Sequence, residues 1–313
     1  MDIIISFIIA IASLLVIMKA ASYAITAISN YAKTTGISEY LIGFLVVSIG
    51  TSLPELSTAI MGSLANQSKL ILGDLIGANI IDVTLVLGLT AIIGKKIVIE
   101  GDAIDKTFLT TIALVILPLI LGFDGKFQRF DGLILLGAFA IYIFRLIKKE
   151  GTLGRIKKSI SIKDIWKDML VFLGSMFALL LSAKWFLISC FQISNYFGIP
   201  TFIMGLVFVA IGTTVPELTV SIRSVLKGHH HIGFGNILGS IIANITLVLG
   251  IAALINPISF DKTRFITSAL FMLTSVVIAI LFLKKKTITW QEGVALLLVY
   301  ITFLVSEGIL FLF

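Results

Sequence analysis

Cysteine, histidine and charged residues are scarce in this sequence. The single cysteine, Cys190, excludes an intramolecular disulfide and a thiolate metal cluster. The three histidines are consecutive, at positions 229–231, in what we expect to be a solvated turn rather than a metal site. The expected membrane spans contain no histidine and no positioned nucleophile with a base. The sequence therefore predicts neither an enzyme nor a cofactor-binding protein.

Charged residues make up only 13% of the 313 positions, whereas hydrophobic residues make up 58%. A soluble domain of this length would need more polar surface, so the composition predicts a membrane protein. Apolar stretches long enough to cross a bilayer as helices recur along the whole chain, which favours an all-α bundle over a β-barrel. We expect ten transmembrane helices, near residues 3–28, 40–63, 70–94, 107–122, 132–147, 168–191, 200–226, 233–256, 265–283 and 290–312.

The net charge of +7 is better explained by the membrane topology of the chain than by binding to nucleic acid, because of where the basic residues lie. Loops and span ends after the odd-numbered spans contain seventeen Lys and Arg residues, against five after the even-numbered spans. The positive-inside rule then places the odd loops in the cytoplasm and both termini outside the cell membrane. The basic stretch 148–167 is expected to be a cytoplasmic linker between a first half, 1–147, and a second half, 168–313.

One segment of the first half returns in the second half. Gly50-Thr51-Ser52-Leu53-Pro54-Glu55-Leu56 matches Gly212-Thr213-Thr214-Val215-Pro216-Glu217-Leu218, at an offset of 212 − 50 = 162. The register continues without a gap over about 43–90 and 205–252, and it places Asp82 opposite Asn244. Because five expected spans separate equivalent points, the two copies should enter the membrane in opposite orientations. The sequence thus predicts two inverted five-helix repeats, a recurrent plan of secondary transporters.

Glu55 and Glu217 fall in the middle of apolar spans. An ionised carboxylate there is costly unless it is paired or binds a cation, so acids inside membranes are usually functional. Pro54 and Pro216 precede them and should kink each helix, which frees the backbone carbonyl four residues earlier. A freed carbonyl beside a carboxylate favours a bound cation. The alternatives are a pair of protonated acids and kinks that only shape the bundle.

Other polar side chains accompany the glutamates at helical spacing. The second and seventh spans carry these candidates on one face, where Ala210 offers only its backbone carbonyl: Ser48, Thr51 and Ser52, then Ala210, Thr213 and Thr214. The third and eighth spans carry a second stripe: Asp74, Ala78 and Asp82, then Asn236, Ser240 and Asn244. Interhelical hydrogen bonding is the alternative role for such residues.

The ligand chemistry selects the ion. Carboxylate, carbonyl, hydroxyl and amide oxygens suit hard cations such as calcium, and sodium accepts many of the same oxygens. If Glu55, Glu217 and Asp82 were all ionised, their charge of −3 would be balanced by three monovalent ions but not by one divalent ion. We therefore expect one acid, Asp82, to stay protonated when calcium binds.

These residues resemble the cation/calcium exchanger superfamily, and most closely its sodium/calcium exchanger branch of archaeal and bacterial type. The resemblance covers nearly the whole chain and is most specific at two stretches that look like that family's alpha-repeats: Gly50 to Glu55 with Gly73 to Asp82, and Gly212 to Glu217 with Gly235 to Asn244. It implies a ten-helix antiporter with alternating access and no cofactor, whose partners are calcium and sodium ions and the lipid bilayer. By position, it implies that Glu55 and Glu217 are central calcium ligands together with the carbonyls of Thr51 and Thr213, and that Ser52, Thr213, Ser240, Ser48 and Ala210 serve sodium.

Three positions depart from the family pattern. Relatives usually carry Asn where Asp82 stands and Asp where Asn244 stands, and Ala78 replaces a serine that would supply a hydroxyl. Exchange of calcium for sodium is therefore the leading hypothesis, and exchange of calcium for protons is the alternative. A cation channel is disfavoured, because conduction requires weak binding at several sites.

Two lysines lie inside expected spans. Matching Asn30-Tyr31 with Asn195-Tyr196 places Lys19 of the first span opposite Lys184 of the sixth, where related exchangers tend to have acids. Snorkelling of both side chains to opposite membrane faces is one interpretation. The other is that they are fixed charges that regulate the sliding of these helices.

Overall fold

The computed structural model describes residues 3–34, 47–98, 103–150, 162–228 and 230–312. The first half contains α1 (Ile3–Thr34), α3 (Ser48–Thr51), α4 (Leu53–Leu64), α5 (Ser68–Ile81), the π-helix η2 (Asp82–Val86), α6 (Leu87–Gly94), α7 (Ala103–Leu121), the short 3₁₀-helix η3 (Gly122–Asp124) and α8 (Arg129–Glu150). The second half contains α9 (Ile162–Phe197), α10 (Thr201–Ile203), the π-helix η4 (Met204–Val209), α11 (Ala210–Thr213), α12 (Val215–Leu226), α13 (His230–Ile242), the π-helix η5 (Ala243–Val248), α14 (Leu249–Ile255), α15 (Lys262–Leu283) and α16 (Trp290–Leu312).

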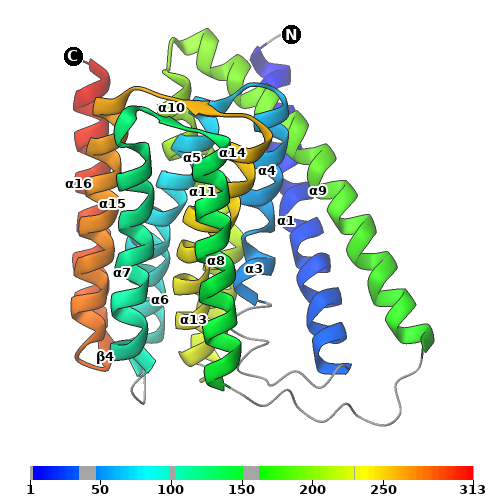
Figure 1. Cartoon of the computed structure of the whole chain (residues 1–313), viewed down its shortest axis with the longest axis vertical. Coiled ribbons are helices and arrows are strands. Elements are labelled where there is room, and N and C mark those ends of the chain that lie inside the picture. Colours follow the sequence, from blue (N-terminus) through cyan, green and yellow to red (C-terminus); the bar gives the residue numbers. More distant parts are fainter. Residues whose placement is uncertain (1–2, 35–46, 99–102, 151–161, 229, 313) are drawn as a thin grey trace.

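These helices form one bundle of elongated, roughly parallel or antiparallel segments (Figure 1). Within the described residues, six helical segments are long and apolar enough to cross a membrane, and the bent pair Thr201–Thr213 with Val215–Leu226 makes a seventh if it is one span. The prediction of a helical, multi-pass membrane protein is therefore confirmed. Most of the predicted linker 148–167, and Gly43 of the first motif, lie outside the described residues.

The centre of the bundle is formed by the segments that carry the repeated motifs. In the most apolar 18-residue stretches of Ser68–Gly94 and Ile232–Ile255, 78% and 83% of the residues are buried inside the protein. The corresponding shares are 28% in Ile3–Ala27 and 33% in Trp166–Phe197. The latter two segments belong to α1 and α9, which pack against each other at one side of the bundle (Figure 1). Polar groups of the motifs are thus enclosed by protein, whereas the outer helices present apolar side chains to lipid.

Two short antiparallel strand pairs join loops at the ends of the bundle. β1 (Lys96–Val98) pairs with β4 (Thr287–Thr289), and β2 (Lys126–Phe127) pairs with β3 (Ile258–Ser259). The sequence analysis expected only helices, so these strands are an addition. Each pair satisfies backbone groups where the chain leaves the helices and ties a first-half loop to a second-half loop.

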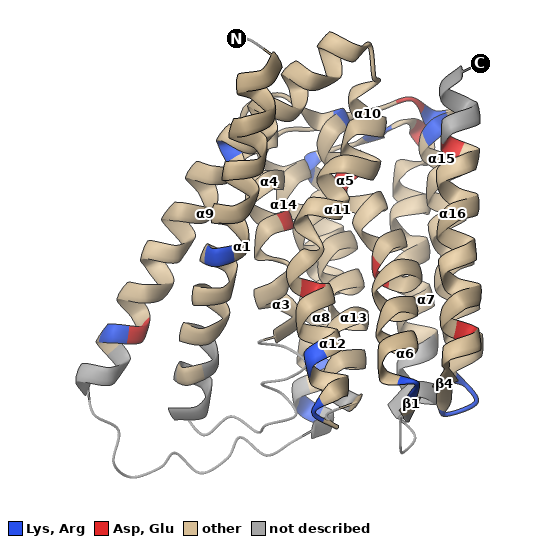
Figure 2. Ribbon diagram, turned by 180° about the vertical axis from the view of Figure 1, so that it is seen from behind, with Lys and Arg blue, Asp and Glu red and all other residues tan. Residues whose placement is uncertain are grey.

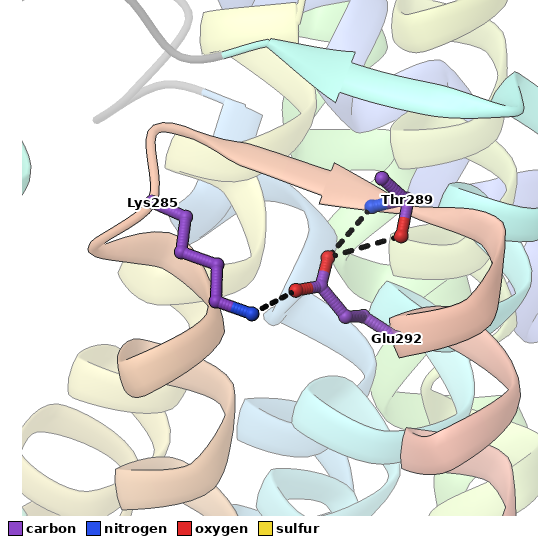
Figure 3. Close-up of polar contacts among 3 residues, drawn as sticks. All are labelled: Lys285, Thr289 and Glu292. Carbon is purple, nitrogen blue, oxygen red and sulfur yellow. Dashed lines mark hydrogen bonds and ion pairs between the residues drawn. The ribbon is translucent and has the colours of Figure 1, made fainter.

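The start of α16 shows how one such loop is fixed. The carboxylate of Glu292 accepts hydrogen bonds from the Thr289 backbone N–H at 2.9 Å and from the Thr289 hydroxyl at 3.2 Å. Its other oxygen pairs with the Lys285 ammonium at 2.9 Å (Figure 3). The glutamate therefore satisfies an N–H group at the helix start and holds the β4 turn against α16.

Glycines bring α5 of the first half into backbone contact with η4 of the second. A Cβ atom added at Gly73 would lie 2.1 Å from the carbonyl oxygen of Phe202, and one at Gly77 would lie 2.0 Å from that of Leu206. From the other side, a Cβ at Gly205 would lie 2.0 Å from the carbonyl oxygen of Leu70. Small residues of this kind allow helices in a membrane to approach closely. The two halves thus meet at this crossing with no side chain between them.

The 162-residue register of the sequence also holds in the secondary structure. α3 and α4 correspond in their bounds to α11 and α12, and the π-helix η5 covers the positions that match η2. The helix breaks at Ser52 in one copy, with φ −78° and ψ 6°, and at Thr214 in the other, with φ −81° and ψ 2°. Across the second break the helix bends by 41°. Both copies are therefore interrupted directly before Pro54 and Pro216, and at the second interruption the predicted kink is present.

Candidate functional site

Two glutamates mark the centre of the site. Glu55 lies in the first turn of α4 and Glu217 in the first turn of α12, each directly after a helix break, and neither side chain is exposed. A proline at the start of each segment lacks the N–H that would continue the preceding helix. A helix start carries partial positive charge, which favours an acid in its first turn. The local sequence thus explains why a carboxylate occupies each break.

The buried acids lie near one another without neutralising partners. Glu55, Glu217 and Asp82 are fully buried, and within the described part of the chain their carboxylate oxygens accept no hydrogen bond. Glu55 is repelled by the negative charge of Asp74 and then by that of Asp82, and Glu217 is repelled by Glu55 and then by Asp82. Four clustered carboxylates without a basic partner are unstable as anions inside a membrane. They require protons or bound cations.

One polar network links the first motif to α13. The hydroxyl of Thr51 donates to the amide oxygen of Asn236 at 2.9 Å and lies 3.3 Å from the hydroxyl of Ser240. The amide nitrogen of Asn236 donates to the backbone carbonyl of Glu217 at 3.3 Å and to the hydroxyl of Ser221 at 3.1 Å. Asn236 thereby connects the two motif segments. Thr51 and Ser240, both predicted site residues, are brought together here.

A second network, at the matching positions, links the second motif to α5. Asp74, which corresponds to Asn236, accepts hydrogen bonds from the hydroxyl of Thr213 at 3.2 Å and from that of Thr58 at 2.8 Å. The same Thr58 hydroxyl lies 2.9 Å from the backbone carbonyl of Glu55, so its one proton is shared between the two acceptors. Each motif threonine is therefore held by a residue of the other half. Asp74 and Asn236 were not among the candidate ligands, although the stripes they begin on the third and eighth spans were the signal for them.

The remaining predicted site residues differ in whether their polar atoms have hydrogen-bond partners. The Ser52 hydroxyl and both amide atoms of Asn244 are buried without a partner in the described structure, so they remain available to a ligand. The Thr214 hydroxyl instead donates to the backbone carbonyl of Ala210 at 2.8 Å. The Ser48 carbonyl accepts from Thr51 at 3.1 Å. Matching residues of the two copies are thus not equivalent in the structure.

Asp82 and Asn244 lie in the π-helices η2 and η5. Single π turns inside α-helices are frequent at functional sites, since the extra residue re-aims the side chains of that turn. Asn79, three residues before Asp82, is also buried with both amide atoms unpaired in the described part of the chain. The sequence analysis did not single out Asn79, because one amide in an apolar helix carries little signal.

The donor set of the site consists of oxygen atoms, with amide nitrogens beside them. In the described residues, no three Asp, Glu, His or Cys side chains are placed to hold a metal ion by themselves. A cation between the glutamates would also need hydroxyl, amide and backbone oxygens, which the two breaks and the two networks supply. Hard cations accept such mixed oxygen ligands.

Sequence comparisons connect this arrangement to known proteins. The profile of the sodium/calcium exchanger protein family matches residues 5–148 and 167–307. Inner membrane protein YrbG of Escherichia coli is 31% identical over 289 residues, which cover 88% of this chain and 88% of that protein. Sodium/calcium exchanger MaX1 of Methanosarcina acetivorans is 27% identical over 343 residues, covering 96% of this chain and 98% of the relative.

Solved structures share the fold. The sodium-calcium exchanger NCX_Mj is 26% identical and superposes with a TM-score of 0.71, covering 97% of this chain and 99% of that one. The H+/Ca2+ exchanger CAX superposes with a TM-score of 0.78 over 96% of this chain and 82% of that one. At 20% identity, the second likeness concerns the fold alone.

Proposed function

The chain belongs to the sodium/calcium exchanger protein family, and from this premise we propose that it is a secondary antiporter that exchanges calcium for sodium by alternating access. The observation that carries the proposal is the pair of unpartnered, fully buried glutamates at matching helix breaks. Such carboxylates favour cations, and a second cation can release the first by competing for the same oxygens. The protein is a transporter rather than an enzyme.

The proposed architecture is a bundle of ten transmembrane helices in two inverted five-helix repeats. One support is the 162-residue offset that relates the helix bounds of the two halves. Another is the direction of the motif helices: the chain from α3 to α4 and the chain from α11 to α12 run in opposite directions through the bundle (Figure 2). Opposite courses of equivalent segments are the arrangement expected when a duplicated half is inserted with reversed orientation. The counts of Lys and Arg in the loops support a cytoplasmic position for the linker 148–167 and external termini.

We assign calcium to the space between Glu55 and Glu217, with the backbone carbonyls of Thr51 and Thr213 beside them. Ser52, Ser240, Ser48 and the Ala210 carbonyl are proposed sodium ligands. Asp82 and Asn244, which lie in the π-helices, complete the proposed set of ligands. Thr214 is the weakest member of the proposed set, because its hydroxyl is engaged by its own helix. Alternating access would expose this one site to each side of the membrane in turn.

Exchange of calcium for protons is the second candidate, and Asp82 is the observation that favours it. This third acid is fully buried and unpartnered in the described structure, and Ala78, one turn earlier on α5, offers no hydroxyl to a sodium ion. A carboxyl group that must be neutral when calcium binds can carry a proton in the opposite direction. Both candidates use the same glutamates and differ in the ion that returns.

Uptake of radioactive calcium into proteoliposomes tests the proposal. An outward sodium gradient should drive uptake, while equal potassium concentrations on both sides should not. A proton gradient that drives uptake without any response to sodium would replace the leading candidate with the second. Uptake that continues without any counter-ion gradient, as passive flux, would indicate a channel.

A further inference from the structure

Lys19 on α1 lines two cavities at once. A cavity of about 320 Å³ between α1 and α12 has walls that include Lys19, Thr26, Pro216 and Arg223. A larger cavity of about 770 Å³ between α1 and α9 is lined by Lys19 and mostly by apolar side chains such as Leu15 and Leu170. A cationic cavity therefore adjoins an apolar one, and Met18 and Lys19 line both.

The smaller cavity is charged with one sign. Its lining contains two cations, Lys19 and Arg223, and no acid. In the described part of the chain, neither side chain forms an ion pair with an Asp or Glu residue, and both are exposed at the outside of the bundle. Two unpaired cations beside lipid are costly unless an anion accompanies them. Electrostatic complementarity therefore selects an anionic ligand.

The two cations lie at different depths: Arg223 is in the last turn of α12, whereas Lys19 is near the middle of α1. α1 and α12 both run away from the end of the bundle that carries the N-terminus (Figure 2). Arg223 lies one turn before the end of α12 at Leu226, which places it nearer the membrane face than the helix start at Val215. The larger cavity extends along α1 as far back as Leu15, towards the middle of the helix. A headgroup at Arg223 would direct its acyl chains along this apolar wall.

We propose that the cavities between α1, α12 and α9 bind an anionic phospholipid, whose phosphate contacts Lys19 and Arg223 and whose acyl chains occupy the groove between α1 and α9. Basic pockets between transmembrane helices are typical sites for anionic headgroups. The apolar groove is the argument for a lipid rather than a free anion, because inorganic phosphate would gain nothing from it. The site is separate from the proposed cation site.

The lipid site has a route to transport. Pro216 lines the smaller cavity and precedes Glu217, whose carboxylate belongs to the buried cluster. A lipid held between α1 and α12 would therefore contact the break that positions this glutamate. Its presence should change the relative position of these helices, which must separate or slide in alternating access.

Lys184 supplies a matched control. It lines a cavity of about 530 Å³ on the α9 side, whose other polar walls are the neutral amides Gln67, Gln192 and Asn195. That cavity contains one cation instead of two and has no charge pattern that selects a phosphate over a neutral headgroup. Replacing Lys184 removes the same kind of charge from an equally exposed helix face.

The binding test uses the full chain in detergent, stripped of lipid and incubated with equal amounts of phosphatidylglycerol and phosphatidylcholine that have identical acyl chains. Native mass spectrometry then counts the bound lipids. The unchanged protein should prefer phosphatidylglycerol, and the double variant Lys19→Gln, Arg223→Gln should lose roughly 30-fold of that preference. Lys184→Gln and the charge-conserving Lys19→Arg should keep it. The single variant Arg223→Gln, at an exposed position, repeats the test if the double variant is not monodisperse.

Three results would overturn the lipid site: no preference in the unchanged protein, an equal loss in Lys184→Gln, or displacement of the lipid by millimolar inorganic phosphate. A second arm compares calcium uptake in phosphatidylcholine liposomes with and without phosphatidylglycerol, and it expects a response that the double variant lacks. This arm rests on the proposed function. Absent calcium transport in every lipid would refute that function while leaving the binding result to stand.

Discussion

The variant Gly77→Ala tests the contact on which the two halves depend. A Cβ atom at this position would lie 2.0 Å from the carbonyl oxygen of Leu206 and 2.8 Å from the Cβ of Ala210. Ordinary contacts of this type need more than 3 Å, so α5 and η4 must separate by about 1 Å. Over-packing of this kind costs roughly 1–3 kcal/mol of folding stability, which exceeds the gain of up to about 1 kcal/mol from replacing a helical glycine with alanine.

The same displacement should reach the site. Asp74 lies on α5, three residues before Gly77, and its hydrogen bond from Thr213 is already 3.2 Å long. A further separation of about 1 Å would break that bond and move Thr213 away from the glutamates. We therefore expect Gly77→Ala to lower the melting temperature in detergent and to reduce calcium uptake at least tenfold.

Gly137 is the matched control, because a Cβ at this position meets nothing within 4 Å. Gly137→Ala should leave both the melting temperature and uptake unchanged or slightly raised. Fluorescence-monitored melting and uptake in proteoliposomes make the two measurements on the same preparations. A Gly77→Ala protein that melts and transports like this control would show that the crossing of α5 and η4 does not limit the fold or the site.

Three further groups of substitutions test the site. Glu55→Gln or Glu217→Gln should abolish calcium uptake. The control Glu292→Gln changes a carboxylate that caps α16, and it should only lower the stability by about 1 kcal/mol. Normal uptake by either site variant would overturn the assignment. Asp82→Asn should keep sodium-driven uptake, because the amide mimics the protonated acid. Uptake by this variant should depend less on pH between mildly acidic and mildly alkaline buffers. Complete loss of uptake would show that Asp82 must be ionised. Asp74→Leu should lower stability by roughly 1–3 kcal/mol, because it removes the acceptor that ties the hydroxyls of Thr58 and Thr213 to α5 and leaves them only backbone carbonyls of their own helices. Asp74→Asn, which keeps one carbonyl oxygen, should cost less in a melting experiment. Equal melting temperatures for the two variants would contradict this.

The positions of the helix breaks could be predicted from the sequence, since proline removes a backbone donor wherever it stands. Pro54 and Pro216 lie in the first turn of their segments, and the acids that follow them are buried as expected. These are local properties, set by one residue and its neighbours within a helical turn.

Partners across the two halves could not be predicted in this way. Asp74 and Asn236 contact the motif threonines of the opposite half because of how α5 and α13 cross the bundle, and a stripe on one helix does not reveal which helix it faces. The Thr214 hydroxyl donates to a backbone carbonyl of its own helix, whereas the hydroxyl of its counterpart Ser52 has no partner in the described structure, and the sequence does not reveal this difference. The strand pairs at the bundle ends depend on loops distant in sequence.

Asp74 and Asn236 occupy equivalent positions, as do Asp82 and Asn244, yet in each pair only the first-half residue is an acid. In a protein made of two identical inverted halves, the conformation open to one side of the membrane would be related by a two-fold rotation to the conformation open to the other side. The two conformations would then have equal energies. In these two pairs the carboxyl groups sit in the first half alone, so the two conformations no longer have equal energies. If the proposed alternating access is correct, the divergence of the copies favours one of the two conformations at rest. The apparent affinity for an ion should then differ between the two faces of the membrane, although both faces would reach the same site.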